Sequence, residues 1–157
     1  LRLDSLFLLM GRYVMDGQDT STAATTIVSL SQPAAALKRI KLGYVQVGSD
    51  ATADNAYEAV VQRGTADGTF TSITAQPRDP ADGAASAVCG EQHSGEPTYT
   101  ANAIQLNIFA HQRATYQWYA APGAEIILAV TNDAMVGLQI ITVTTAFNMG
   151  VVFEFEE

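Results

Sequence analysis

The side chains best suited to chemistry lie between positions 67 and 111. The single cysteine, Cys89, lies four residues before His93, and the second histidine, His111, is distant. A structural zinc site needs four nitrogen or sulfur ligands, and these residues supply three at most. A Cys–His nucleophile pair needs a third group that orients the histidine and a feature that lowers the thiol pKa, and the sequence indicates neither. We therefore expect an unreactive thiol and no bound metal.

Three aspartates, Asp67, Asp79 and Asp82, could instead form a calcium site or a carboxylate pair for acid–base catalysis. The segment lacks the alternating oxygen ligands of a calcium loop. Asp79 and Asp82 stand in a Pro- and Gly-rich stretch, where aspartate more often forms turns. The sequence also shows no Gly-rich phosphate loop and no Ser-His-Asp motif. We predict a protein that is not an enzyme and holds no cofactor.

Three neighbouring aromatic residues, Tyr116, Trp118 and Tyr119, could stack on a sugar ring, as in a carbohydrate-binding module. On an alternating strand, Tyr116 and Trp118 share one face, which favours a place in the core. Tyr119 then lies on the opposite face, and it is the better candidate for a contact with a partner.

Strand patterns run through the whole chain. Alternation of apolar and polar residues favours a strand over a short helix at Tyr57, Ala59 and Val61, and the segment 137–147 has apolar residues on both faces, as in a central strand. Two further sets of residues should each share an inward face: Ile40, Leu42 and Tyr44; Val151, Phe153 and Phe155. About eight to ten short strands separated by turns predict an all-β, single-domain β-sandwich or jelly roll over residues 11–157.

Residues 77–98 interrupt this pattern with many Pro, Gly, Asp and Ser residues. A loop of roughly twenty residues is long for a compact domain, and such loops are usually functional or disordered. We predict one long Pro/Gly/Asp-rich loop here. Arg78, Asp79 and Asp82 within it are candidates for binding a partner.

The composition is poor in charge. Only 15% of the residues are charged, below the usual quarter, which is common where neighbouring proteins cover much of a surface. Sixteen acidic and eight basic residues give a net charge of −8, and the basic residues are scattered apart from a group at 38–41. Direct binding to nucleic acid is therefore not expected. The single cysteine allows no intrachain disulfide, which fits assembly in a reducing cytoplasm.

The first ten residues, LRLDSLFLLM, form an apolar N-terminal arm or extension. The segment is too short to span a membrane, and it lacks the basic start and small-residue cleavage site of a signal peptide. It could cap the core of its own domain or bind a partner, and Met10 could also be an ordinary start of translation. The arm residues that we consider for a partner contact are Leu3, Leu6, Phe7, Leu8 and Leu9.

The stretch Gln76–Ser86, QPRDPADGAAS, resembles a loop of small structural proteins from tailed-bacteriophage virions. In those chains, an Arg-rich N-terminal strand and a strand similar to Ile40–Ser49 come before this loop. An aromatic strand, a Pro-Gly turn and a final pair of apolar strands follow it. Arg12, Tyr116–Trp118 and Pro122-Gly123 fit these other places, whereas residues 1–9 are not part of the pattern.

The resemblance implies a capsid decoration (cement) protein on the exterior of a virion that is assembled in the host cytoplasm. Its partners would be the major capsid protein and further copies of itself, commonly in a homotrimer, with no contact to nucleic acid or a membrane. The alternatives are another virion component, such as a tail, fibre or head-spike protein, and a carbohydrate-binding module. A small hydrolase would need a pocket that holds Asp79, Asp82 or His93.

Overall fold

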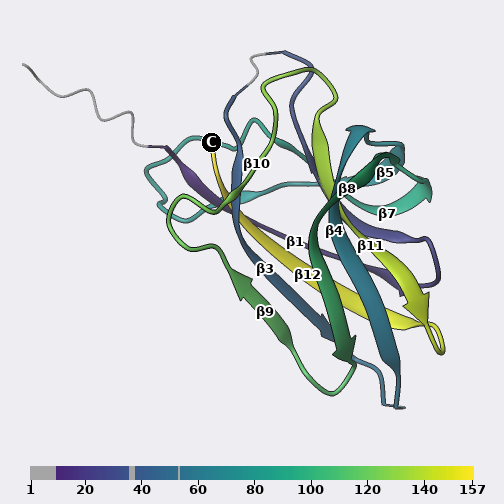
Figure 1. Ribbon diagram of the computed structural model, residues 1–157. Helices are drawn as coiled ribbons and strands as arrows, with labels where there is room; N and C mark the ends of the chain where they lie inside the picture. The colour runs from purple at the N-terminus through teal and green to yellow at the C-terminus, as the bar shows by residue number, and fades with distance from the viewer. Residues whose placement is uncertain (1–9, 36–37, 53) are drawn as a thin grey trace, which may run out of the picture.

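The computed structural model describes residues 10–35, 38–52 and 54–157, which form twelve strands in two antiparallel six-stranded sheets (Figure 1). The two sheets pack face to face, so the predicted β-sandwich is confirmed, and the jelly-roll connectivity stays a prediction. No helix in the described ranges is long and apolar enough to cross a membrane. The arm residues Leu3, Leu6, Phe7, Leu8 and Leu9 lie outside the described residues.

The first sheet has the strand order β10-β3-β12-β1-β6, and β9 also pairs with β3. All of these pairings are antiparallel. The strands of this sheet are β1 (Arg12–Ser21), β3 (Lys41–Ser49), β6 (Gln76–Pro77), β9 (Tyr116–Tyr119), β10 (Ile126–Ile127) and β12 (Phe147–Glu156).

The second sheet has the strand order β5-β7-β2-β11-β4-β8. The predicted central strand of the 137–147 segment is β11, which has β2 and β4 as its two neighbours. The strands of this sheet are β2 (Thr26–Ser31), β4 (Ala56–Ala66), β5 (Thr69–Ile73), β7 (Val88–Gly95), β8 (Thr98–His111) and β11 (Met135–Val143).

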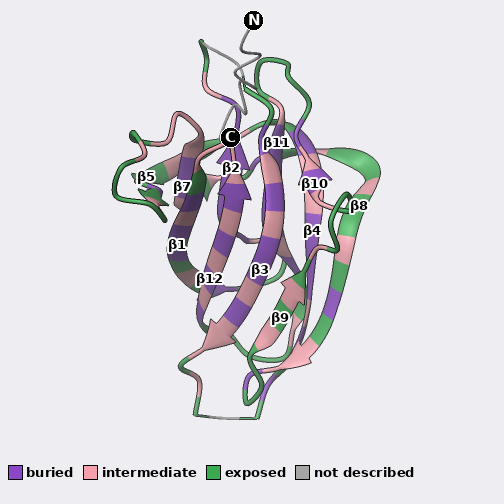
Figure 2. Cartoon of the chain, turned by 90° about the vertical axis from the view of Figure 1, so that its left-hand side faces the viewer, coloured by how far each residue is buried: buried purple, intermediate pink, exposed green. Residues whose placement is uncertain are grey.

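The core lies between the sheets and follows the predicted alternation in most strands. Val151, Phe153 and Phe155 of β12 are buried, and the residues between them are half-buried, so β12 shows alternating bands in Figure 2. Tyr57, Ala59 and Val61 of β4 belong to the same core, which confirms a strand there. Burial of these side chains is the main stabilising term of the fold, at about 1.5–3 kcal/mol for each large aliphatic or aromatic side chain.

A two-stranded ribbon joins the two ends of the second sheet. β4 continues through Asp67 and Gly68 into β5, and β7 continues through Glu96 and Pro97 into β8. The two legs stay in antiparallel register, with Ala66 opposite Thr98 and Thr69 opposite Gly95. Because β4 pairs with β11 and β7 pairs with β2, the ribbon spans the width of β2 and β11. Every residue of β2 is buried, because the core covers its inner face and the ribbon covers its outer face.

The predicted long loop is shorter than expected. Residues 88–95 form β7, which pairs with both β2 and β5, so only residues 78–87 separate β6 from β7. The glycines of this segment favoured a loop in the prediction, because a glycine inside a strand lowers the stability of that strand. At Gly90, an added Cβ would lie 2.6 Å from the Phe70 ring. Close packing therefore requires glycine inside a strand here.

The predicted inward position of Tyr44 is wrong. Ile40 and Leu42 do point into the core, but the pairing with β12 shifts between Glu154 and Phe155, so β3 carries an extra residue at Gly43. A bulge of one residue reverses the faces of the residues beyond it. Val45 and Val47 therefore enter the core, and Tyr44 lies on the outer face of the first sheet beside Tyr119.

Candidate functional site

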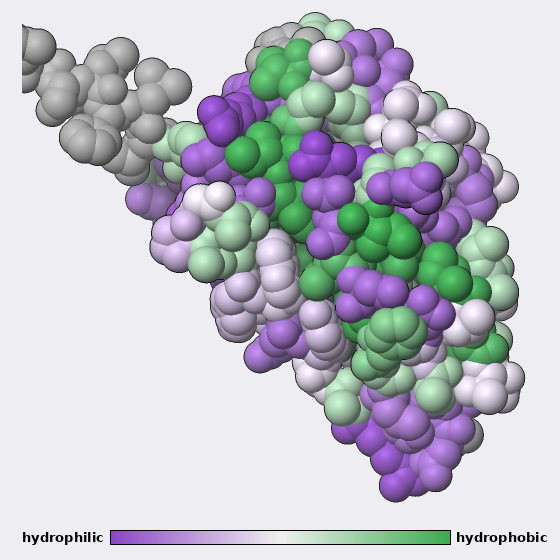
Figure 3. Space-filling view, in the orientation of Figure 1, coloured by the Kyte–Doolittle hydropathy of each residue, from purple (hydrophilic) through white to green (hydrophobic). Residues whose placement is uncertain are grey.

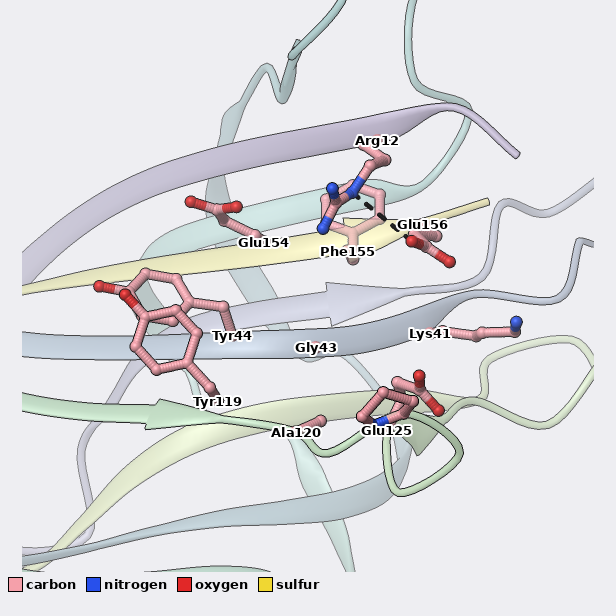
Figure 4. A pocket seen from close by; sticks show the side chains of 11 residues that line it. Arg12, Lys41, Gly43, Tyr44, Tyr119, Ala120, Glu125, Glu154, Phe155 and Glu156 are labelled. Atoms are coloured by element: carbon pink, nitrogen blue, oxygen red, sulfur yellow. Dashed lines mark ion pairs between the residues drawn. The ribbon is translucent and has the colours of Figure 1, made fainter. Parts of the chain in front are cut away.

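A groove of about 280 Å³ lies on the outer face of the first sheet. In Figure 4, Tyr44 and Tyr119 lie at one end of it, and Lys41 and Glu125 lie at the other. The floor is formed by the ends of β3 and β12, and the wall is formed by the chain that follows β9. The groove is lined by Arg12, Lys41, Gly43, Tyr44, Tyr119, Ala120, Pro122, Glu125, Glu154, Phe155 and Glu156.

The two tyrosines form the aromatic part of this groove. Their ring centroids lie 4.5 Å apart, and the Tyr44 hydroxyl donates a hydrogen bond of 2.6 Å to Gln46 Oε1. Tyr119 is 70% exposed, which confirms its predicted outward position, whereas Tyr116 and Trp118 pack against the core. An exposed ring beside polar groups is suited to contact with a sugar or with an aromatic side chain of a protein.

Ion pairs occupy the rest of the groove. Arg12 Nε lies 3.5 Å from Glu156 Oε1, and Arg78 pairs with Glu154. The backbone N–H groups of Glu125 and Gly123 lower the pKa of the Glu125 carboxyl, so this carboxylate is ionised at neutral pH. Since Glu154 and Glu156 are each held by an arginine, the arrangement is suited to polar binding rather than to proton transfer.

The three candidate residues of the 78–87 segment differ in their position relative to the groove. The side chain of Arg78 reaches the groove floor through Glu154, and its backbone N–H donates to the Arg12 carbonyl at 2.7 Å. Asp79 forms a turn, as the sequence indicated, because its Oδ1 accepts from the Ala81 N–H at 2.9 Å and its carbonyl accepts from the Asp82 N–H at 3.0 Å. Neither Asp79 nor Asp82 lines the groove.

Glu157 holds the other end of this segment and was missed by the sequence interpretation. Its side chain has no exposed surface, and it accepts hydrogen bonds from the backbone N–H groups of Ser86 at 2.7 Å and Ala87 at 2.9 Å. Lys38 Nζ lies 3.2 Å from the same carboxylate. The segment 78–87 is thus attached at both ends to the end of β12, and much of its structure serves the fold.

Cys89 and His93 do not form a reactive pair. Cys89 is in the core, and burial raises the pKa of its thiol to about 12, so the thiol stays protonated. His93 lies on the opposite face of the second sheet, where its Nε2 is 3.1 Å from Ser29 Oγ. No group of three or more potential metal ligands occurs among the described residues.

A partly buried polar layer lies beneath the ribbon, between it and β2. Ser31 donates a hydrogen bond to Asp67, His93 contacts Ser29, and the hydroxyl groups of Thr26 and Tyr99 lie 2.9 Å apart. Within the described chain, Asp67 Oδ1 and His93 Nδ1 have no hydrogen-bond partner. A catalytic triad needs a carboxylate on His Nδ1, and Asp67 instead bonds to Ser31. The residues come from separate strands, so no local motif could have predicted the layer.

The edge of the second sheet provides a different kind of surface. The 14-residue strand β8 contains no charged residue, and among the described strands it pairs with β4 alone. Phe109 is 73% exposed and Ile104 is 50% exposed. Both lie on the outer face, because their partners across the ladder are Glu58 and Gln62. Figure 3 shows hydrophobic surface across the middle of the face on which β8 and β10 lie.

Comparison with known proteins found no similarity to a family: no family model, no curated protein and no solved structure matches the chain.

Proposed function

We propose that the chain is a non-catalytic structural protein of a tailed-phage virion, of the decoration type, that binds the major capsid protein on the exterior of the capsid. The observation that carries this proposal is the charge-free strand β8, at a sheet edge with which no other described strand pairs, where Phe109 is 73% exposed and Ile104 is 50% exposed. Contiguous exposed apolar surface marks sites of protein–protein contact. The resemblance of Gln76–Ser86 to a loop of phage structural proteins suggests that the assembly is a virion.

The groove and the β8 edge belong to different sheets, so one copy offers two separate surfaces to its neighbours. A protein that joins several partners through separate surfaces is held by multivalency, without any one strong contact. This arrangement is suited to a clamp over a lattice, and a homotrimer would multiply the contacts. A tail, fibre or head-spike protein would use the same surfaces elsewhere in the particle.

Imaging of intact particles from the source of this sequence, by electron cryo-microscopy, tests the proposal. The expected result is density that fits the sandwich on the outside of the capsid, repeated with the capsid lattice, with three copies at each site. Density at the tail or at a single vertex would establish the alternative virion component. Particles without the chain would overturn both.

A carbohydrate-binding module is the second candidate, and the Tyr44–Tyr119 pair at 4.5 Å favours it. A glycan array followed by titration calorimetry tests this function. Binding that is lost in Tyr119→Ala, and kept in the matched control Phe109→Ala on the other sheet, would support it. The absence of glycan binding by the unsubstituted chain would exclude it.

A further inference from the structure

A shallow hollow of about 820 Å³ lies over one end of β11, β4 and β8, which run side by side in the second sheet (Figure 1). The pairing of these strands aligns Thr142, Glu58 and Phe109 in one row, so their side chains share the outer face. Of the described residues that line the hollow, Glu58 alone has a carboxylate, and none is Lys or Arg. The hollow thus presents one negative charge beside an exposed aromatic ring.

Glu58 has no counter-charge in the part of the chain that the structure describes. The four ion pairs found there join other residues, and Glu58 is half-buried. Arg113, which follows His111 at the end of β8, pairs with Asp54 instead. Val60, on the same face of β4, is 1% exposed, so apolar groups border the carboxylate. Surroundings of low polarity strengthen the attraction between opposite charges, so a cation from a partner fits this hollow.

The edge of β8 next to the hollow is suited to main-chain pairing. Other described strands at a sheet edge are short: β5 has five residues, β9 has four, and β6 and β10 have two each. Natural sheets protect their edges with short strands, prolines and charges. β8 has 14 residues, no proline and no charge, and its pairing with β4 is regular from Leu106 to His111. An extended segment can therefore add to this edge with Phe109 in register.

We propose that an extended segment of a partner protein adds to the edge of β8 and places an arginine across Phe109, where it pairs with Glu58. Neighbouring strands lie about 4.8 Å apart, so the residue opposite Phe109 in the added strand is about 10 Å from the backbone of Glu58. An extended arginine and a glutamate side chain together close this gap, and the guanidinium then lies over the Phe109 ring. Arginine suits this place because its planar group stacks on aromatic rings and bonds both oxygens of a carboxylate.

A second copy of the chain does not supply this arginine at β8. Its own β8 contains no charged residue, so an antiparallel pair of β8 strands would leave Glu58 unpaired in both copies. Arg12, Arg78 and Arg113 are already paired with carboxylates. The net charge of −8 also favours a basic partner. The inference rests on the proposed role of β8 as a contact surface, and it adds the chemistry of the partner there.

Titration with two peptides, followed by nuclear magnetic resonance of the isotope-labelled chain, tests the inference. One probe is a short, end-capped peptide of alternating threonine and valine with a central arginine. The other carries citrulline, which has nearly the same shape without the charge. The arginine peptide should shift the amide signals of β8 and the ring signals of Phe109. The citrulline peptide should bind about tenfold more weakly, because hydrogen bonds to a charged group contribute more than neutral ones.

Substitutions in the chain identify the group that recognises the charge. Glu58→Gln should lower the affinity for the arginine peptide about tenfold and spare that for the citrulline peptide, so that the two peptides bind equally. The matched control is Asp16→Asn, which removes the same charge from an exposed site on β1 and should change neither affinity. Phe109→Leu keeps an apolar side chain, and loss of the ring should weaken binding of the arginine peptide about threefold.

Two kinds of result would overturn the inference. Equal binding of both peptides to the unsubstituted chain, or an effect of Glu58→Gln no larger than that of Asp16→Asn, would remove the role of Glu58. Shifts at Tyr119 instead of β8, no binding of the arginine peptide, or a dimer of the chain that Ile104→Lys dissociates would exclude the added partner strand. These results do not depend on whether intact particles contain the chain, so this inference and the proposed function fail separately.

Discussion

The outer faces of the two sheets differ in how their polar and apolar groups are arranged. On the first sheet, arginine–glutamate pairs and two tyrosines border an open groove. On the second sheet, polar groups are partly buried beneath the ribbon, and the apolar side chains of Ile104 and Phe109 are exposed at β8. The first face is suited to reversible, salt-sensitive contacts, because exposed charge pairs are screened by salt. The second is suited to a lasting contact that removes apolar surface from water.

The largest difference in the loss of unfolding free energy should appear between substitutions on the two faces of β8. Ile108→Ala removes a fully buried side chain and should lower the free energy of unfolding by about 2–5 kcal/mol. Ile104→Ala removes a half-exposed side chain and should cost less than about 1 kcal/mol in the isolated chain. Denaturation in urea measures both values. Equal losses would mean that Ile104 already belongs to the core.

The second largest difference in stability should appear between substitutions of two neighbouring glutamates at the C-terminal end of β12. Glu157→Gln replaces one of the two acceptor oxygens with an amide donor that faces the N–H group of either Ser86 or Ala87 in a buried site, and it should cost about 1–3 kcal/mol. Glu156→Gln breaks only the exposed pair with Arg12 and should cost less than about 1 kcal/mol. Thermal unfolding at low and high salt provides the comparison. A larger loss for Glu156→Gln would contradict the role of Glu157 in anchoring the 78–87 segment.

A smaller, pH-dependent effect on stability is expected in the partly buried polar layer. Burial is the main cause that lowers the pKa of His93 from its ordinary value of 6.5. Below about pH 6.5, the unfolded chain therefore binds more protons at this residue than the folded chain. Its contribution to stability is present above that pH and is lost as the pH falls through the folded pKa. His93→Gln should reduce the loss of stability between pH 7.5 and pH 5, and an unchanged pH dependence would argue against a half-buried, neutral His93.

The smallest effect on the fold is expected at the groove. Tyr119→Ala removes a 70% exposed ring and should change the free energy of unfolding by no more than about 0.5 kcal/mol. Urea denaturation is again the measurement. A loss above about 1 kcal/mol would show that the Tyr44–Tyr119 contact stabilises the sheet and is not free for a partner.

The sequence by itself determined the fold class and most of the core. Period-2 alternation depends only on the geometry of a strand, so Val151, Phe153 and Phe155 could be placed inside without knowing their neighbours. The exposure of Tyr119 followed from the same rule. The turn at Asp79 followed from local side-chain-to-backbone hydrogen bonding.

Only the tertiary structure decided the features that depend on partners far along the chain. A bulge opposite β12 turned Tyr44 outward, and the packing of Phe70 made Gly90 part of a strand. The layer around Asp67 and His93 needs the ribbon to fold over β2. The free edge of β8 is also a property of strand order, which sequence alternation does not encode. Local rules thus described each strand, and long-range pairing set which strand remained open.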